Sequence, residues 1–311
     1  MQKGIFANAS PLTRLTLTAT VVALCFSFFY FAGLLVARFA FHIDFKDLNG
    51  DLAAQFVANH AGAFQFLQIM QTTGMFIIPP FIVGYLIQRD APSYLAMRSR
   101  TSIQAYLIAP VIIIASIPFI NYLVSFNEAM HLPESLRSLE TWMKESEKNA
   151  ESLTQTFVQA KTWKQLGFNL FMIALLPAVG EELLFRGILQ KQFTELTRNV
   201  HAGIWIAAAV FSFMHFQFYG FIPRLILGVL LGYVFFITGS LWIPILAHFT
   251  NNAITVIFYY LYDAGKIDNT AQEIGTTTND LYIAFLSLAV VVLLMITLYL
   301  AEVRHRQSST K

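Results

Sequence analysis

Long apolar stretches are the feature of this sequence that most limits what it can fold into. A helix needs about 20 mostly apolar residues to cross a bilayer, and the chain offers about eight such stretches. Backbone polar groups cannot stay unpaired in lipid, so these runs satisfy them internally as helices. The sequence therefore predicts an all-α, polytopic bundle of transmembrane helices. The expected spans lie near 16–40, 66–88, 103–125, 166–190, 200–219, 221–238, 241–262 and 281–303.

The composition supports the same class and excludes others. Of 311 residues, 56% are hydrophobic and 12% are charged, whereas roughly a quarter are charged in an average soluble domain. The net charge of +2 and the lack of a Lys/Arg-rich run exclude a nucleic-acid partner. Cys25 is the single cysteine, so we interpret it as a small packing residue rather than half of an intrachain disulfide.

Basic residues in the short loops predict the orientation of the helices. Loops rich in Lys and Arg stay on the cytoplasmic side of a membrane. Basic and acidic loops alternate along this chain, so we expect eight spans with both termini in the cytoplasm. The cytoplasmic side is marked by Lys3, Arg14, Arg89, Arg98, Arg100, Lys191, Arg198, Arg304, Arg306 and Lys311. The outer side is marked by Asp44, Asp47, Asp51, Asp263, Asp268, Glu273 and Asp280.

The chain divides into four parts on this scheme. Residues 1–125 hold the first three spans, and 166–262 hold spans four to seven, which carry the informative polar residues. Residues 263–311 form a loop, the last span and a cytoplasmic tail. The polar stretch 126–165 repeats apolar residues at helical spacing, which predicts an amphipathic helix on the outer surface. The alternative for this stretch is a solvated connector with no part in substrate handling.

Two acids and an arginine enter the fourth span. A charged side chain at bilayer depth costs about 2.5 to 3.5 kcal/mol, so such residues usually face the bundle interior and have a function. Glu182 and Arg186 are four residues apart on one helical face and are expected to pair. Successive residues of a helix are rotated by about 100°, so Glu181 points away from Glu182. Glu181 is therefore the carboxylate available for chemistry. The alternative is a structural salt bridge alone.

Two later spans add imidazoles. His215 follows the apolar run of the fifth span, and His248 and Asn252 share one face of the seventh. A single histidine in a helix is more often a hydrogen-bonded core residue than a catalyst. Together with Glu181, however, these residues supply a base for water and donors for an oxyanion. The pattern predicts peptide hydrolysis in a cavity shielded from lipid.

Three other features have simpler interpretations. Gly228 and Gly232 form a Gly-x-x-x-Gly pair, which favours close packing of the sixth span. Arg224 either extends to the membrane interface or binds a carboxylate of the substrate, and the first is favoured. The segment 238–240, Thr-Gly-Ser, is expected to be a turn.

The motifs on successive spans resemble a known family. Glu181-Glu182-x-x-x-Arg186, Phe211-x-x-x-His215 and His248-x-x-x-Asn252 resemble the CPBP family, the CAAX-protease and bacteriocin-processing group of intramembrane peptidases. The stretch 239–248, Gly-Ser-Leu-Trp-Ile-Pro-Ile-Leu-Ala-His, is similar to that family too. The resemblance covers about 175–255, and the first three spans are not diagnostic.

The resemblance implies an α-helical membrane endopeptidase related to the Ras-converting enzyme, which removes the last three residues of prenylated Cys-a-a-X proteins. By that analogy Glu181 activates the attacking water with help from His215. His248 and Asn252 form the oxyanion site. Glu182 and Arg186 support them. The expected partners are the lipid bilayer and a peptide or lipidated protein substrate, and the expected location is the bacterial cytoplasmic (inner) membrane.

The resemblance leaves the cofactor open. Glu181, His215 and His248 make a three-ligand set for zinc or another divalent metal with one open position. We favour a mechanism without a metal, because the chain lacks the His-Glu-x-x-His motif that fixes zinc in many proteases.

Two other functional classes compete with the peptidase. A non-enzymatic membrane scaffold or bacteriocin-immunity-type protein would keep the polar cluster as a binding site, because many membrane bundles bury polar networks without catalysis. A transporter would use the acids for proton coupling. The transporter ranks last, since the sequence shows no paired broken helices and no two-half symmetry.

Overall fold

The protein, seen in a computed structural model that describes residues 3–43, 56–57, 59–268, 274–276 and 280–309, is built from helices. Within these residues no strand forms beyond an isolated bridge between Lys3 and Gln88. The predicted all-α class is therefore confirmed. Five residues that mark the predicted orientation lie outside the described part of the chain: Asp44, Asp47, Asp51, Glu273 and Lys311.

Helical structure is present in each of the eight predicted spans. Among the described residues, six helices are long and apolar enough to cross a membrane, and α11 is apolar but shorter. The chain is thus a polytopic helical membrane protein. Its helices are α1 (Pro11–Ala40), α3 (Ala61–Thr72), α4 (Ile78–Ile87), α5 (Ala91–Tyr94), α6 (Ile103–Glu128), α7 (Arg137–Val158), α8 (Trp163–Asn169), α9 (Leu176–Leu184), α10 (Gln190–Thr197), α11 (Val200–Phe213), α12 (Phe221–Thr238), α13 (Trp242–Asp263) and α15 (Leu281–Ser309).

Wide π-helical turns join several short helices into longer ones. They cover Thr73–Ile77, Leu170–Leu175 and Phe185–Leu189. The first two come just before Pro79 and Pro177. A proline has no N–H to donate, and its ring clashes with the carbonyl four residues earlier, so a wider turn lets the helix continue. As a result α8, α9 and α10 form one long helix that spans 163–197.

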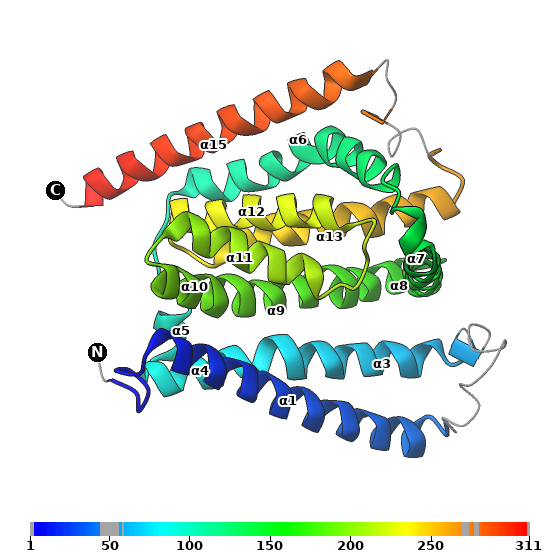
Figure 1. Ribbon diagram of the computed structural model, residues 1–311, viewed down its shortest axis with the longest axis horizontal. Coiled ribbons are helices and arrows are strands. Elements are labelled where there is room, and N and C mark those ends of the chain that lie inside the picture. The colour runs from blue at the N-terminus through cyan, green and yellow to red at the C-terminus, as the bar shows by residue number, and fades with distance from the viewer. Residues whose placement is uncertain (1–2, 44–55, 58, 269–273, 277–279, 310–311) are drawn as a thin grey trace.

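The helices are stacked in layers (Figure 1). α1, α3 and α4 form one edge of the bundle, α6 and α15 form the opposite edge, and α9 to α13 lie between them. One buried apolar cluster links α6, α12, α13 and α15. A second links α4, α9, α12 and α13. The start of α1 and the end of α15 lie at the same end of the bundle, and α7 lies at the other end.

The polar stretch 126–165 contains the helix that its periodicity predicted. α6 ends at Glu128, a short turn follows at Glu134–Leu136, and α7 then begins at Arg137. Within α7, the carboxylate of Glu140 accepts hydrogen bonds from Lys144 and from His131, which precedes the helix. The hydrogen bond from Lys144, followed by that from His131, lowers the pKa of Glu140 to about 2. α7 is therefore fixed to the segment that precedes it.

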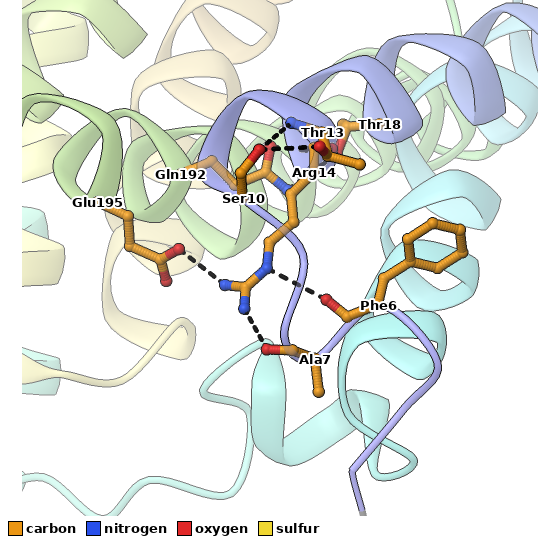
Figure 2. A network of polar contacts seen from close by, with 8 residues as sticks. All are labelled: Phe6, Ala7, Ser10, Thr13, Arg14, Thr18, Gln192 and Glu195. Atoms are coloured by element: carbon orange, nitrogen blue, oxygen red, sulfur yellow. Dashed lines mark hydrogen bonds and ion pairs between the residues drawn. The ribbon is translucent and has the colours of Figure 1, made fainter.

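A polar network ties the start of α1 to α10 (Figure 2). Arg14 donates to the carboxylate of Glu195 at 2.7 Å and to the carbonyl oxygen of Ala7 at 2.5 Å. Glu195 is 43% exposed, so this ion pair alone contributes little stability. Thr18 and Gln192 are buried and share hydrogen bonds of 2.9 and 3.1 Å. This buried contact sets the position of α1 against the long helix that carries Glu181.

The Gly-x-x-x-Gly pair packs α12 closely on α11, as the sequence predicted. A Cβ atom added at Gly228 would lie 3.0 Å from the Cβ of Ala208. One added at Gly232 would lie 2.8 Å from Cγ2 of Ile204. The expected turn after α12 is also present, because Gly239 ends that helix with a φ of 65°.

A buried carboxylate on α15 caps the start of α6. Oε1 of Glu302 accepts hydrogen bonds from the Thr101 hydroxyl at 2.6 Å, the Ser102 N–H at 2.9 Å and the Ser102 hydroxyl at 2.6 Å. Glu302 is 1% exposed. We expect Glu302→Ala to lower the free energy of unfolding by about 3 kcal/mol, because buried donors lose a charged acceptor. Thermal unfolding in detergent, followed by circular dichroism, measures the loss.

Two variants serve as controls for this prediction. Glu302→Gln keeps an acceptor oxygen and should lose less than half as much. Arg304→Ala removes an exposed side chain of the same helix and should leave the melting temperature unchanged. Equal melting temperatures for Glu302→Ala and the wild type would show that the cap does not hold α15 to α6.

Candidate active site

The two adjacent acids lie on α9 between the π-helical turns Leu170–Leu175 and Phe185–Leu189. π-Helical turns are frequent at functional sites because they change the direction of nearby side chains. Gly180 precedes the acids, and a Cβ atom there would lie 2.8 Å from the Cβ of Phe76. The missing side chain lets α9 approach the helix containing Phe76. The acids are therefore held by close helix packing rather than by a loop.

The predicted Glu182–Arg186 pair is confirmed. Nη1 of Arg186 donates to Oε1 of Glu182 at 2.6 Å, and their side chains are 2% and 0% exposed. Nη2 of Arg186 donates to the carbonyl oxygen of Gly228 on α12 at 2.8 Å. The guanidinium also lies over the ring of Phe211 on α11, 5.3 Å from its centroid. One arginine thus connects three helices around the site.

His248 on α13 faces both acids. Its Nδ1 is 2.8 Å from Oε1 of Glu182, and its Nε2 is 3.7 Å from Oε2 of Glu181. The contact with Glu182 is a hydrogen bond, whereas the distance to Glu181 is too long for one. The side chains of His248 and Glu181 are only 4% and 13% exposed. Nε2 of His248 and the carboxylate of Glu181 therefore face each other just beyond hydrogen-bond distance.

His215 lies just beyond the end of α11, which ends at Phe213. Its Nδ1 lies 2.9 Å from the carbonyl oxygen of Phe211. A carbonyl only accepts hydrogen bonds, so Nδ1 carries a proton. When the ring is neutral, Nε2 therefore presents a lone pair. The ring of Phe211 lies 5.0 Å from that of His215 and 5.9 Å from that of His248. Phe211 is therefore the packing residue that both imidazoles share.

Asn252 lies one turn after His248 on α13. Its side-chain oxygen accepts a hydrogen bond of 3.2 Å from the amide of Asn251. The side-chain NH2 group of Asn252 has no protein partner among the described residues. An amide donor is thus available one helical turn from the imidazole of His248.

The segment between α11 and α12, which carries His215, is held by α6 and α7. Asn127 donates to the carbonyl oxygen of Phe218 at 3.0 Å, and the N–H of Tyr219 donates to Glu147 at 3.3 Å. The rings of Trp142 and Phe218 lie 5.6 Å apart. Burial raises the pKa of Glu147 above its ordinary value. The helix predicted at 126–165 therefore contacts the site segment rather than only connecting two spans.

The sequence predicted one contact among the candidate residues but not the others. The spacing of Glu182 and Arg186 predicted their pair. It did not predict the hydrogen bond between Glu182 and His248, because these residues lie on different helices and are 66 positions apart in the sequence. The predicted span 200–219 was too long, since α11 ends at Phe213. The contacts of Asn127 and Glu147 with the site segment had no signal in the sequence.

The candidate metal ligands are not gathered as a ligand set. Among the described residues, no three His, Cys, Asp or Glu side chains are close enough together to hold a metal ion. His215 directs Nδ1 to Phe211, and His248 directs Nδ1 to Glu182. Glu181, His215 and His248 therefore do not fit a three-ligand zinc site in this arrangement. The preference for a mechanism without a metal remains a prediction.

The fold and the cluster together define a helical membrane protein with acid and base groups inside its bundle. Residues 163–254 match the family model described as Rce1-like, type II CAAX prenyl endopeptidase Rce1-like. All six candidate residues, from Glu181 to Asn252, lie within this segment. The resemblance to the Ras-converting-enzyme-like peptidases is therefore confirmed for this part of the chain.

A curated relative is similar over a segment of comparable length. The uncharacterized protein YpbD of Bacillus subtilis (strain 168) is 34% identical over 90 residues. The aligned segment covers 28% of this chain and 43% of the relative. No solved structure matches the chain.

Proposed function

We propose that the protein is an intramembrane endopeptidase that hydrolyses a peptide bond of a membrane-associated or lipidated substrate, in the manner of CAAX processing. The family match over 163–254 supports this reaction class. The observation that carries the proposal is the approach of Glu181 to His248, at 3.7 Å between their side chains. The pair combines a base with a hydrogen-bond donor at one point inside a membrane bundle.

In the proposed reaction Glu181 removes a proton from a water molecule. The water oxygen forms a bond to the carbonyl carbon of the substrate, and the π electrons of that carbonyl move to its oxygen. The proton then passes to the amide nitrogen as the C–N bond breaks, which leaves a carboxylic acid and an amine. Nε2 of neutral His215 is a second acceptor that helps to orient the water.

His248 and Asn252 donate to the oxyanion in this scheme. Nδ1 of His248 already donates to Glu182, so Nε2 donates only when the ring carries protons on both nitrogens. Glu182 accepts this hydrogen bond and also pairs with Arg186, so the two residues fix the orientation of the His248 ring. The buried pair thereby holds Nε2 of His248 in position to donate to a developing oxyanion.

Hydrolysis by purified protein tests the proposal. The substrate is a synthetic peptide that contains an S-farnesyl cysteine followed by three residues, presented in detergent micelles. We expect cleavage after the cysteine, identified by mass spectrometry of both products. Intact peptide after prolonged incubation with folded protein would contradict processing of lipidated substrates. Stoichiometric zinc in the active protein, measured by elemental analysis, would contradict a mechanism without a metal.

A non-enzymatic membrane scaffold is the second candidate. The observation that favours it is the Glu182–Arg186–His248 network, which also stabilises the fold without any reaction. A cellular phenotype separates the two functions. A phenotype that survives both Glu181→Gln and His215→Ala supports the scaffold, whereas its loss at normal expression supports the enzyme.

The orientation in the bacterial cytoplasmic membrane is part of the same proposal. Arg14, Arg98, Arg198 and Arg306 lie in segments at the end of the bundle where α1 starts and α15 ends (Figure 1). Clustering of basic residues at one end is typical of the cytoplasmic side. Cysteine labelling from outside intact cells should therefore modify Ser146→Cys on α7 but not Ser308→Cys on α15.

A further inference from the structure

Arg224 is a cation at the start of α12 whose side chain is hydrogen-bonded to the segment that precedes the helix. Its Nη1 donates to the carbonyl oxygen of Gln217 at 3.2 Å, and its Nη2 donates to the side-chain oxygen of the same residue. A Cβ atom at Gly220 would lie 2.6 Å from both nitrogens. The guanidinium therefore lies against the glycine, held by the segment that carries His215.

This guanidinium lies on the side of α12 that faces the candidate active site. Arg224 is one helical turn before Gly228, whose carbonyl oxygen bonds Arg186. Residues four apart share a helical face, so Arg224 and this carbonyl are on the same side of α12. Glu181 is also close enough for its charge to act on Arg224.

The charge of Arg224 is not neutralised by direct contact. In the described part of the chain, no carboxylate oxygen lies within 4.0 Å of its guanidinium nitrogens. Glu147 on α7 is within electrostatic range, but its carboxylate accepts the N–H of Tyr219. A guanidinium has five N–H donors, and Gln217 is the partner of two of its nitrogens. Donors therefore remain for a ligand.

We infer that Arg224 is a specificity-determining residue that binds a carboxylate of the peptide substrate on the C-terminal side of the scissile bond. This inference rests on the proposed peptidase function. A planar guanidinium matches a carboxylate because two parallel N–H donors meet its two oxygens. The shared chemistry fits either a free C-terminus or an acidic side chain. A carboxylate bound to Arg224 places the substrate within reach of Glu181. It also supplies hydrogen-bond acceptors to guanidinium donors that have lost part of their contact with water.

Matched peptides test the inference and separate the two sources of the carboxylate. The S-farnesyl cysteine peptide is prepared with a free C-terminus, with a C-terminal amide, and as an amide whose last residue is Asp. Binding is measured by fluorescence anisotropy with the Glu181→Gln protein, so that the result does not depend on turnover. We expect the free acid or the Asp amide to bind about 10- to 100-fold more tightly than the plain amide.

Substitutions at the site should remove this preference. In Arg224→Gln the affinity ratio between acid and amide should fall to about one, and in Arg224→Lys it should be intermediate, because the ammonium keeps the charge without the planar pair of donors. Gly220→Ala should lower the ratio too, since its methyl group displaces the guanidinium while the charge remains. Arg137→Gln makes the same chemical change as Arg224→Gln at an exposed position of α7 and should keep the wild-type ratio.

The outcomes separate this inference from the proposed function. Equal affinity of the protein for all three peptides, or an unchanged ratio in Arg224→Gln, would overturn the role of Arg224 even if hydrolysis is observed. Preferential binding of a carboxylate that depends on Arg224 would support the role even if the wild type cleaves none of the peptides. Absence of cleavage would then count against the peptidase alone. Size-exclusion profiles identify any variant that has lost its fold.

Discussion

Replacement of Glu181 by glutamine is expected to lower kcat for hydrolysis by about 10³-fold, because general acid–base catalysis typically contributes two to four orders of magnitude. Glutamine has nearly the same shape but does not accept the proton of water. The new side chain keeps the position of Glu181, whose Oε2 lies 3.7 Å from Nε2 of His248. The loss should therefore appear in kcat rather than in peptide binding. Initial rates with the S-farnesyl cysteine peptide measure both.

The control for this prediction is Glu195→Gln. It makes the same chemical change on α10, in the same long helix, but at a partly exposed carboxylate that pairs with Arg14 (Figure 2). Its kcat should stay within about twofold of the wild type, since an exposed ion pair contributes little. If Glu181→Gln and Glu195→Gln retain the same activity, Glu181 is not the base.

The fold was largely predictable because lipid leaves few choices. Apolar runs such as 281–303 must form helices in a bilayer, and α15 covers that stretch. Helix ends were less predictable, because they depend on packing rather than on hydropathy. α10 continues to Thr197 since Gln190 and Gln192 are buried against other helices. α11 stops early, and Phe216 beyond it adopts a φ of 51°, which no sequence pattern indicated.

The candidate site was predictable where spacing within one helix decides the contact. Glu182 and Arg186 are four residues apart, so the helix itself brings them together. The bond from His248 to Glu182 depends instead on how α13 is rotated against α9, and Phe211 on α11 helps to set that rotation. The local positions of Glu181 and His215 follow from a π-helical turn and a helix end, respectively, and neither feature can be derived from residue spacing.

The Glu182–Arg186 pair supplies the largest expected effect on stability. We expect Arg186→Met to lower the free energy of unfolding by about 3 to 5 kcal/mol, because loss of one partner leaves a buried charge uncompensated. Glu182 is fully buried. Its Oε2 has no hydrogen-bond partner among the described residues, so the carboxylate depends on Arg186 and His248 at Oε1. Denaturant unfolding in detergent micelles measures the change.

A double-mutant cycle tests whether this loss comes from the uncompensated charge. In Arg186→Met combined with Glu182→Gln no buried charge remains unpaired, and the side-chain oxygen of the new glutamine would still accept the hydrogen bond from His248. The double variant should therefore be more stable than Arg186→Met alone, whereas independent sites would give additive losses. Arg137→Met, at an exposed position of α7, should leave stability unchanged. Strict additivity would mean that the lost contact with Gly228, rather than the charge of Glu182, causes the destabilisation.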